Sequence, residues 1–202
     1  MKNAKIIIKQ LLKAVIHLQE ANIFHRDIKA ENILIETGSK VPKIYLIDFG
    51  VSCFDDLKNY KHFHGTWVHV PPEFDRQGFH SSGPTNVWQV GLVLYYILHK
   101  KQFFTRGFLS KRLKINTRLS EKCKDFLTKC LTVDPEKRPT LEELLHHRWV
   151  DFSKNVSNFF LMQILLSFLF CKTYNRYVMP HRPLQAYFTV SQLRKADHVL
   201  SY

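Results

Sequence analysis

Apolar residues recur at steps of three and four positions near the start of the chain. They are Ile8, Leu11, Leu12, Val15 and Leu18. At 3.6 residues per turn this spacing places them on one face, so we predict an amphipathic helix over residues 5–19. Asn22 follows, and asparagine tolerates the left-handed conformation in which many helices end.

Further along, the pattern changes from helical to strand-like and back. Residues 32–36 and 43–47 are short apolar runs on either side of a turn at 37–40, which predicts two strands. Residues 85–98 are hydrophobic on nearly all sides, which predicts a buried helix at the centre of the molecule. A helix is also expected over residues 120–131 with Ser120 as its cap, and another after Thr140, because Thr140 and Glu143 have the spacing of a capping box.

Composition places the chain among globular proteins. It has 202 residues, of which 45% are hydrophobic and 23% charged, enough for one substantial core. The four cysteines lack Cys-x-x-Cys spacing and no secretory leader is evident, so we expect a reducing environment, cytoplasmic and also nuclear. Cys123 and Cys130 are seven positions apart on one helix face, as expected for core thiols.

The formal net charge of +13 would attract acidic partners such as nucleic acid. The basic residues are nevertheless spread along the chain. Their densest cluster is typical of a solvated surface and consists of Lys111, Arg112, Lys114 and Arg118. We therefore expect no dedicated nucleic-acid site.

Two motifs carry the chemistry. The first is the octet His25-Arg26-Asp27-Ile28-Lys29-Ala30-Glu31-Asn32, and the second is the triplet Asp48-Phe49-Gly50. Asp27 can accept the proton of an attacking hydroxyl, and Lys29 can steady a transferring phosphate. Asn32 and Asp48 can hold the Mg²⁺ ions that bridge the phosphates of ATP. The predicted strands bring these last two residues to neighbouring strand ends.

In this order and spacing, the motifs resemble those of eukaryotic protein kinases of the serine/threonine type. Lys29, placed two residues after the catalytic aspartate, is typical of that type. Later landmarks follow in the expected order: Gly65-Thr66, Pro71-Pro72-Glu73, Asn86-Val87-Trp88-Gln89-Val90-Gly91 and Arg138. The amino-acid sequence around both motifs is most similar to that of the Pim family.

The resemblance implies an α+β, mainly α-helical fold, namely the C-terminal lobe of a kinase over residues 1–150. It implies ATP and Mg²⁺ as cofactors. The catalytic residues would be Asp27, Lys29 and Asn32, and the nucleotide or its metal would be contacted by Lys29, Asn32 and Asp48. Leu34 and Ile47 would form the floor of the adenine pocket. Glu31 and Thr66 would contact substrate. The structural residues would be His25, Arg26, Phe49 and Gly50, with Glu73 and Arg138 as a buried ion pair.

Other expected kinase parts do not occur in the sequence. No Gly-x-Gly is present, so we expect the glycine-rich loop and the N-terminal, β-rich lobe to be absent from this chain. Asn86 stands where most kinases carry an aspartate that binds the backbone of the catalytic loop. Its amide could still accept a hydrogen bond, or Asn86 could simply begin a helix. A catalytically inactive kinase lobe that only binds partners is therefore the alternative function.

Residues 151–202 do not resemble kinase sequence. Their apolar part, 155–171, is near the lower limit for crossing a bilayer. Three interpretations stay open: a membrane anchor, a helix packed on the lobe, or a disordered or artefactual tail from splicing or gene prediction. The last is favoured over membrane attachment.

The partners implied are protein substrates, and the protein is expected to be monomeric. Glu31 occupies a position where an acidic residue faces a basic residue of the substrate, so substrates should be basic around the phosphorylated Ser or Thr. Between Cys53 and Gly65 the only hydroxyl belongs to Tyr60. Arg26 therefore has no ordinary phosphate to pair with, and Asp55 or Asp56 is expected to serve as a fixed anion instead.

Overall fold

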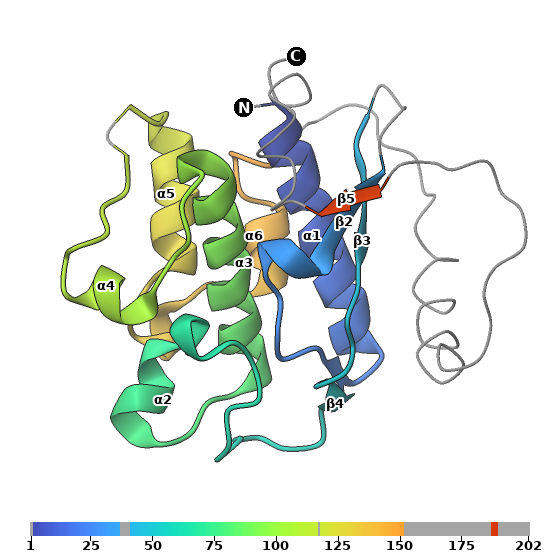
Figure 1. Ribbon diagram of the computed structural model, residues 1–202, viewed down its shortest axis with the longest axis vertical. Helices are drawn as coiled ribbons and strands as arrows, with labels where there is room; N and C mark the ends of the chain where they lie inside the picture. The colour runs from blue at the N-terminus through green and yellow to red at the C-terminus, as the bar shows by residue number, and fades with distance from the viewer. Residues whose placement is uncertain (1, 37–40, 117, 152–186, 190–202) are drawn as a thin grey trace, which may run out of the picture.

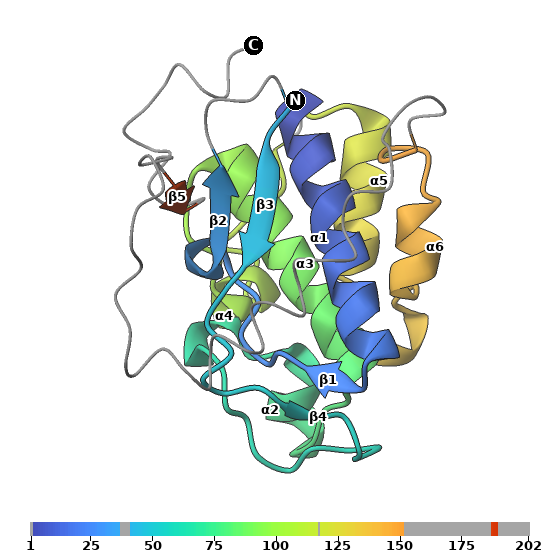
Figure 2. The ribbon, with the colours of Figure 1, turned by 90° about the vertical axis from the view of Figure 1, so that its right-hand side faces the viewer.

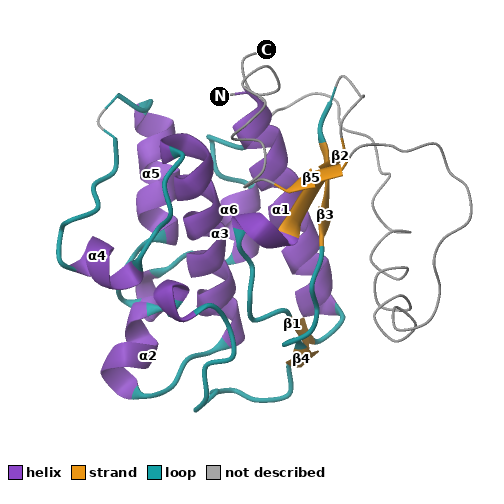
Figure 3. Cartoon of the chain, in the orientation of Figure 1, coloured by secondary structure: helices purple, strands orange, loops and turns teal. Residues whose placement is uncertain are grey.

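The structure, a computed structural model, describes residues 2–36, 41–116, 118–151 and 187–189. Its elements, in chain order, are α1 Lys2–Glu20, β1 Ile23–Phe24, η1 Ala30–Asn32, β2 Ile33–Glu36, β3 Lys43–Leu46, β4 Cys53–Phe54, η2 Trp67–His69, α2 Pro72–Gln77, α3 Ser82–His99, α4 Thr105–Leu109, α5 Glu121–Cys130, η3 Pro135–Lys137, α6 Leu141–Leu145 and β5 Tyr187–Thr189. The described part is mainly helical with a few short strands (Figure 3).

Helix α3 forms the centre of the core, as its apolar sequence predicts. It contacts α1, α5 and α6 (Figure 1). Twelve consecutive residues of α3, 85–96, are buried, because neighbouring helices cover it on several sides. Its start differs from the prediction: the helix begins at Ser82, and Asn86 lies inside it. The interpretation of Asn86 as a helix-start residue is therefore wrong.

A glycine allows α3 and α5 to approach closely. A Cβ atom added at Gly91 would lie 2.8 Å from Cβ of Cys130 and 2.9 Å from Cδ2 of Leu131. Both distances are far inside van der Waals contact, so only glycine fits. Cys123 and Cys130 are both buried in the hydrophobic core, which confirms that they are core thiols.

The strands lie beside α1 (Figure 2). β2 pairs with β3 in antiparallel register, with Ile33 opposite Leu46 and Glu36 opposite Lys43. Its other edge pairs with β5, so residues 187–189 of the predicted non-kinase tail form a strand. β1 pairs separately with β4. Asn22, with φ 53°, adopts the left-handed conformation between α1 and β1.

The two predicted helix caps differ in outcome. The hydroxyl of Thr140 accepts a hydrogen bond from the backbone N–H of Glu143 at 3.2 Å, and the Glu143 carboxylate accepts one from the backbone N–H of Thr140 at 2.9 Å. The capping box is therefore confirmed. Ser120 precedes α5 as expected, but its side chain makes no capping bond.

Most of the tail, including the apolar segment 155–171, lies outside the described residues, as does the predicted turn at 37–40. Within the ranges that the structure does describe, no helix is both long and apolar enough to span a bilayer.

Candidate functional site

The octet, residues 25–32, follows β1 and ends with η1, directly before β2, and buried His25 is its first residue. Nε2 of His25 donates to the carbonyl oxygen of Ile47 at 3.1 Å, while Nδ1 accepts from the backbone N–H of Asp27 at 3.3 Å. The ring also packs on Phe49, with 4.7 Å between centroids. Burial lowers the pKa of His25, although hydrogen bonding and nearby acids oppose the shift. One neutral ring thus joins both motifs.

The carboxylate of Asp27 is surrounded by donors. Oδ1 accepts from the hydroxyl of Thr66 at 2.7 Å and from its backbone N–H at 3.0 Å. Oδ2 lies 2.7 Å from Nζ of Lys29 and accepts from Nδ2 of Asn32 at 3.4 Å. The structure therefore brings together three residues predicted to be catalytic and one predicted to bind substrate.

These contacts set the charge of Asp27. Burial alone would raise the pKa of Asp27, but the hydrogen bonds from Lys29 and Thr66 and the charge of Lys29 outweigh it and lower the pKa. The carboxylate is therefore ionised at neutral pH. Nζ of Lys29 also donates to the Thr66 hydroxyl at 2.8 Å, so this cation is held at the same point.

The predicted metal ligands, Asn32 and Asp48, are joined through the backbone. The N–H of Ile47, the residue before Asp48, donates to the carbonyl oxygen of Asn32 at 2.9 Å. Nδ2 of Asn32 donates to the Asp27 carbonyl at 2.8 Å, and within the described residues no hydrogen bond to the amide oxygen of Asn32 is seen. Asp48 is exposed, with φ 64°, and accepts one bond, from Gly50 N–H at 3.2 Å.

The donor set of Asn32 and Asp48 fits a magnesium ion, because carboxylate and amide oxygens are the hard ligands that Mg²⁺ takes, with water completing the shell. No group of three or more His, Cys, Asp or Glu residues that could hold a metal occurs in the part of the chain that the structure describes. The two predicted adenine-floor residues, Leu34 on β2 and Ile47 just after β3, are half buried on adjacent strands.

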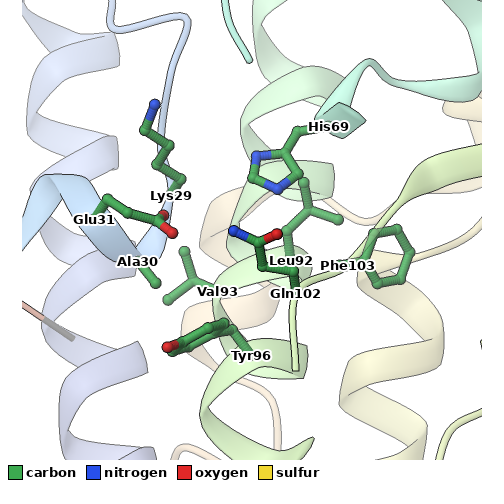
Figure 4. A pocket seen from close by; sticks show the side chains of 9 residues that line it. All are labelled: Lys29, Ala30, Glu31, His69, Leu92, Val93, Tyr96, Gln102 and Phe103. Carbon is green, nitrogen blue, oxygen red and sulfur yellow. The ribbon is translucent and has the colours of Figure 1, made fainter. Parts of the chain in front are cut away.

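A small pocket opens beside Lys29 (Figure 4). Its lining includes Ala30 and Glu31 of the octet, and its floor is largely apolar. The full set is Lys29, Ala30, Glu31, His69, Leu92, Val93, Tyr96, Gln102 and Phe103. Burial lowers the pKa of His69 despite the nearby charges of Glu31 and Asp27. Glu31 is the single carboxylate in this lining.

Arg26 contacts an aromatic ring rather than an acid. Its guanidinium carbon lies 5.2 Å from the ring centroid of Tyr60, and its Nε is buried without a hydrogen-bond partner among the described residues. The Tyr60 hydroxyl donates to Asp55 at 2.7 Å. The expectation that Asp55 or Asp56 pairs directly with Arg26 is therefore wrong for the described residues: the Tyr60 ring contacts Arg26, and the Tyr60 hydroxyl binds Asp55.

Glu73 and Arg138 form the ion pair that the resemblance implies. Nη1 of Arg138 lies 2.8 Å from one carboxylate oxygen of Glu73, and Nη2 lies 2.5 Å from the other. Both side chains are buried. Arg138 also donates to the carbonyl oxygens of Thr132, Pro84 and Val133. The bidentate pair links the start of α2 to the segment after η3.

Sequence reasoning missed Gln89. Its side chain, on α3, donates from Nε2 to the carbonyl oxygen of Arg26 at 2.7 Å and accepts at Oε1 from the N–H of Ile28 at 3.2 Å. Asn86, which was expected to hold this loop, has a buried Oδ1 with no hydrogen-bond partner among the described residues. The available signal was a polar residue inside the otherwise apolar run of α3.

Comparison with known proteins adds to this geometry. A protein kinase domain model matches residues 1–150. Serine/threonine-protein kinase 1 of African swine fever virus (strain Badajoz 1971 Vero-adapted) is 34% identical over 149 residues, covering 72% of this chain and 49% of the viral protein. Serine/threonine-protein kinase pim-2 of Danio rerio is 34% identical over 149 residues, covering 73% of this chain and 47% of that protein. The chain thus spans about half the length of these relatives.

Proposed function

The chain belongs to the protein kinase family, and from this premise we propose that residues 1–150 are the catalytic lobe of a serine/threonine protein kinase. The similarity to pim-2 agrees with the resemblance to the Pim family drawn from the motifs. The observation that carries the proposal is the Asp27 carboxylate, which Lys29 and Thr66 hold ionised and which Nδ2 of Asn32 also contacts.

The chemistry follows from these positions. A substrate hydroxyl oxygen would bond to the γ-phosphorus of ATP as the bond to the bridging oxygen of the leaving ADP breaks. Asp27 would orient that hydroxyl and receive its proton, and Lys29 would offset the charge on the transferring phosphoryl group. Mg²⁺, when bound by Asn32 and Asp48, supplies positive charge to the phosphates. Leu34 and Ile47 would contact the adenine.

The pocket beside Lys29 favours substrates with a basic residue close to the phosphorylated hydroxyl. Lys29 is engaged by Asp27, so among the described residues that line the pocket no cation pairs with Glu31. The stem of a lysine or arginine can lie across the mouth of this pocket while its charge meets Glu31. Because only one acid lines the pocket, the preference for basic peptides should be moderate.

The test uses this chain extended at its N-terminus by a nucleotide-binding lobe. Asp48→Asn should abolish Mg²⁺-dependent transfer of labelled phosphate to protein, because a neutral amide is a poor substitute for a carboxylate at the metal. Asp27→Asn should leave ATP binding unchanged and lower turnover. Asp151→Asn, an exposed change after the matched region, is the control.

The outcomes separate the two candidate functions. Full activity in both site variants would overturn the assignment of the site. ATP binding without turnover in the parent would favour the inactive, partner-binding lobe. The 202-residue chain alone should show little transfer compared with the ~1–100 s⁻¹ typical of kinases, because the sequence supplies no glycine-rich loop to position the phosphates.

A further inference from the structure

One side chain of α3 contacts the backbone on both sides of the catalytic aspartate. Gln89 is 1% exposed. Its amide nitrogen donates to the carbonyl oxygen of Arg26, and its amide oxygen accepts from the N–H of Ile28. These two backbone groups flank Asp27, so a single planar amide spans the residue proposed to receive the substrate proton.

Asn86, one helical turn earlier on α3, makes no comparable contact. It is 3% exposed, and its Oδ1 is buried without a hydrogen-bond partner among the described residues. Two buried amides three positions apart therefore differ sharply: one is satisfied by the catalytic loop at both ends and the other has an unused oxygen. The contrast is informative because buried polar atoms are normally hydrogen-bonded.

We propose that Gln89 is a positioning residue that holds Asp27 in place by binding the loop backbone before and after it. The role rests on the proposed kinase function for its catalytic consequence, but the contact itself does not. An amide is the side chain suited to this position, because it offers a donor and an acceptor together, whereas a carboxylate offers acceptors only.

The loop needs such support because its backbone is strained and crowded. Arg26 has φ 71°, in the left-handed region that is unfavourable for residues with a Cβ atom. Its carbonyl oxygen would lie only 2.5 Å from a Cβ atom added at Gly65. Gln89 contacts this carbonyl from α3, and Gly65, in the loop before η2, packs against it, so two parts of the chain fix the conformation at Arg26.

The experiment compares Gln89→Met, which keeps the length of the side chain without its hydrogen bonds, with Asn86→Leu as the matched control on the same helix. In the 202-residue chain, amide hydrogen exchange at Ile28 should rise at least tenfold in Gln89→Met relative to the core amide of Leu12. It should be unchanged in Asn86→Leu. Equal exchange at Ile28 in parent and Gln89→Met would overturn the proposal.

A measurement on the unaltered chain covers the case in which Gln89→Met does not fold. The side-chain amide protons of Gln89 should exchange more slowly than those of exposed Gln77 and show nuclear Overhauser contacts to the loop at Arg26. Fast exchange of the Gln89 side-chain amide protons, without such contacts, would refute the proposal that Gln89 binds the loop backbone.

A kinetic measurement on the N-terminally extended protein tests whether the two Gln89 hydrogen bonds affect turnover. Gln89→Met should lower kcat by about tenfold to a hundredfold at an unchanged KM for ATP, since misplacing a catalytic group affects the chemical step. If the parent protein itself shows no turnover, the proposed kinase function is wrong, and hydrogen exchange alone then tests whether Gln89 holds the loop backbone. An unchanged kcat with raised exchange at Ile28 would contradict the positioning role.

Discussion

Among single residues, Glu31 offers the most direct test of the proposed substrate preference. We predict that Glu31→Gln lowers turnover of peptides with Arg near the phosphorylated hydroxyl by about tenfold or more, the equivalent of the ~1.5–3 kcal/mol that a charge-assisted contact contributes. Peptides without basic residues should be affected little. A peptide array on the N-terminally extended protein measures this.

The control for this change is Glu142→Gln, an exposed carboxylate on α6. The net charge of +13 repels basic peptides at long range whichever glutamate is altered. A parent profile that favours acidic peptides, or an array that is the same for the parent and Glu31→Gln, would show that this carboxylate does not set specificity.

Glu73 provides a prediction about stability at the same scale. Glu73→Gln should lower the free energy of unfolding by about 3–5 kcal/mol, because it leaves the buried guanidinium of Arg138 without its charge partner. Urea unfolding of the 202-residue chain measures the loss, with exposed Glu136→Gln as the control. A loss below ~1 kcal/mol would mean that the backbone carbonyls around Arg138 satisfy it without Glu73.

At the scale of elements, the activation segment, residues 51–70, packs against the octet and against His80 through Tyr60. Tyr60 is 3% exposed, contacts Arg26 through its ring, and pairs with His80 through backbone hydrogen bonds of 2.7 and 3.0 Å. The rings of Phe24 and His80 pack against it. Unmodified side chains make these contacts, so we expect the segment to keep this conformation without a phosphate.

We predict that phosphatase treatment leaves the activity of the N-terminally extended protein unchanged. Tyr60→Phe should keep most of the activity, because the ring under Arg26 is retained. Tyr60→Leu should lose it, since a leucine offers no aromatic face to the guanidinium. Labelled-phosphate transfer measures both. A large loss after phosphatase, or equal activity in Tyr60→Leu and the parent, would count against this arrangement.

Elements governed by periodic burial could be predicted from the sequence. The helices at α1, α3, α5 and α6 and the pairing of β2 with β3 all follow from apolar spacing and capping chemistry, since a local pattern fixes which face must be covered. The predicted ends moved by one to three residues, because neighbouring elements determine where a helix stops being covered.

The candidate site was predictable only as a set of residues. The octet names Asp27, Lys29 and Asn32, but the contacts that hold them come from Thr66 and Gln89, which are 39 and 63 positions from their partners. Gln89 and Asn86 are one turn apart on α3, and no local pattern tells which of two such amides reaches the loop. Tertiary packing decides that.

At the scale of the whole molecule, buried histidines make stability depend on pH. Burial lowers the pKa of His25 and of His80 from 6.5. The unfolded chain therefore binds these protons more readily than the folded chain, so stability is full above pH ~6.5 and falls as the pH drops below it. Each histidine contributes a slope of up to ~1.4 kcal/mol per pH unit.

Urea unfolding of the 202-residue chain at pH 7.5, 6.5 and 5.5 should therefore show a falling free energy between the last two values. His80→Gln should flatten part of this slope, whereas exposed His146→Gln should leave it unchanged. A free energy that is constant from pH 7.5 to 5.5 would contradict the assignment of these rings as neutral in the folded chain.

The ion pair of Glu73 and Arg138 also has a consequence in time. The two residues are 65 positions apart. A ribosome adding about 5–20 residues per second would need about 3–13 s to make Arg138 after Glu73. Over that interval the nascent chain carries a carboxylate that is buried in the folded protein, so we expect α2 to dock only after Arg138 has emerged. A ribosome paused before Arg138 should therefore hold the activation segment in a protease-sensitive form.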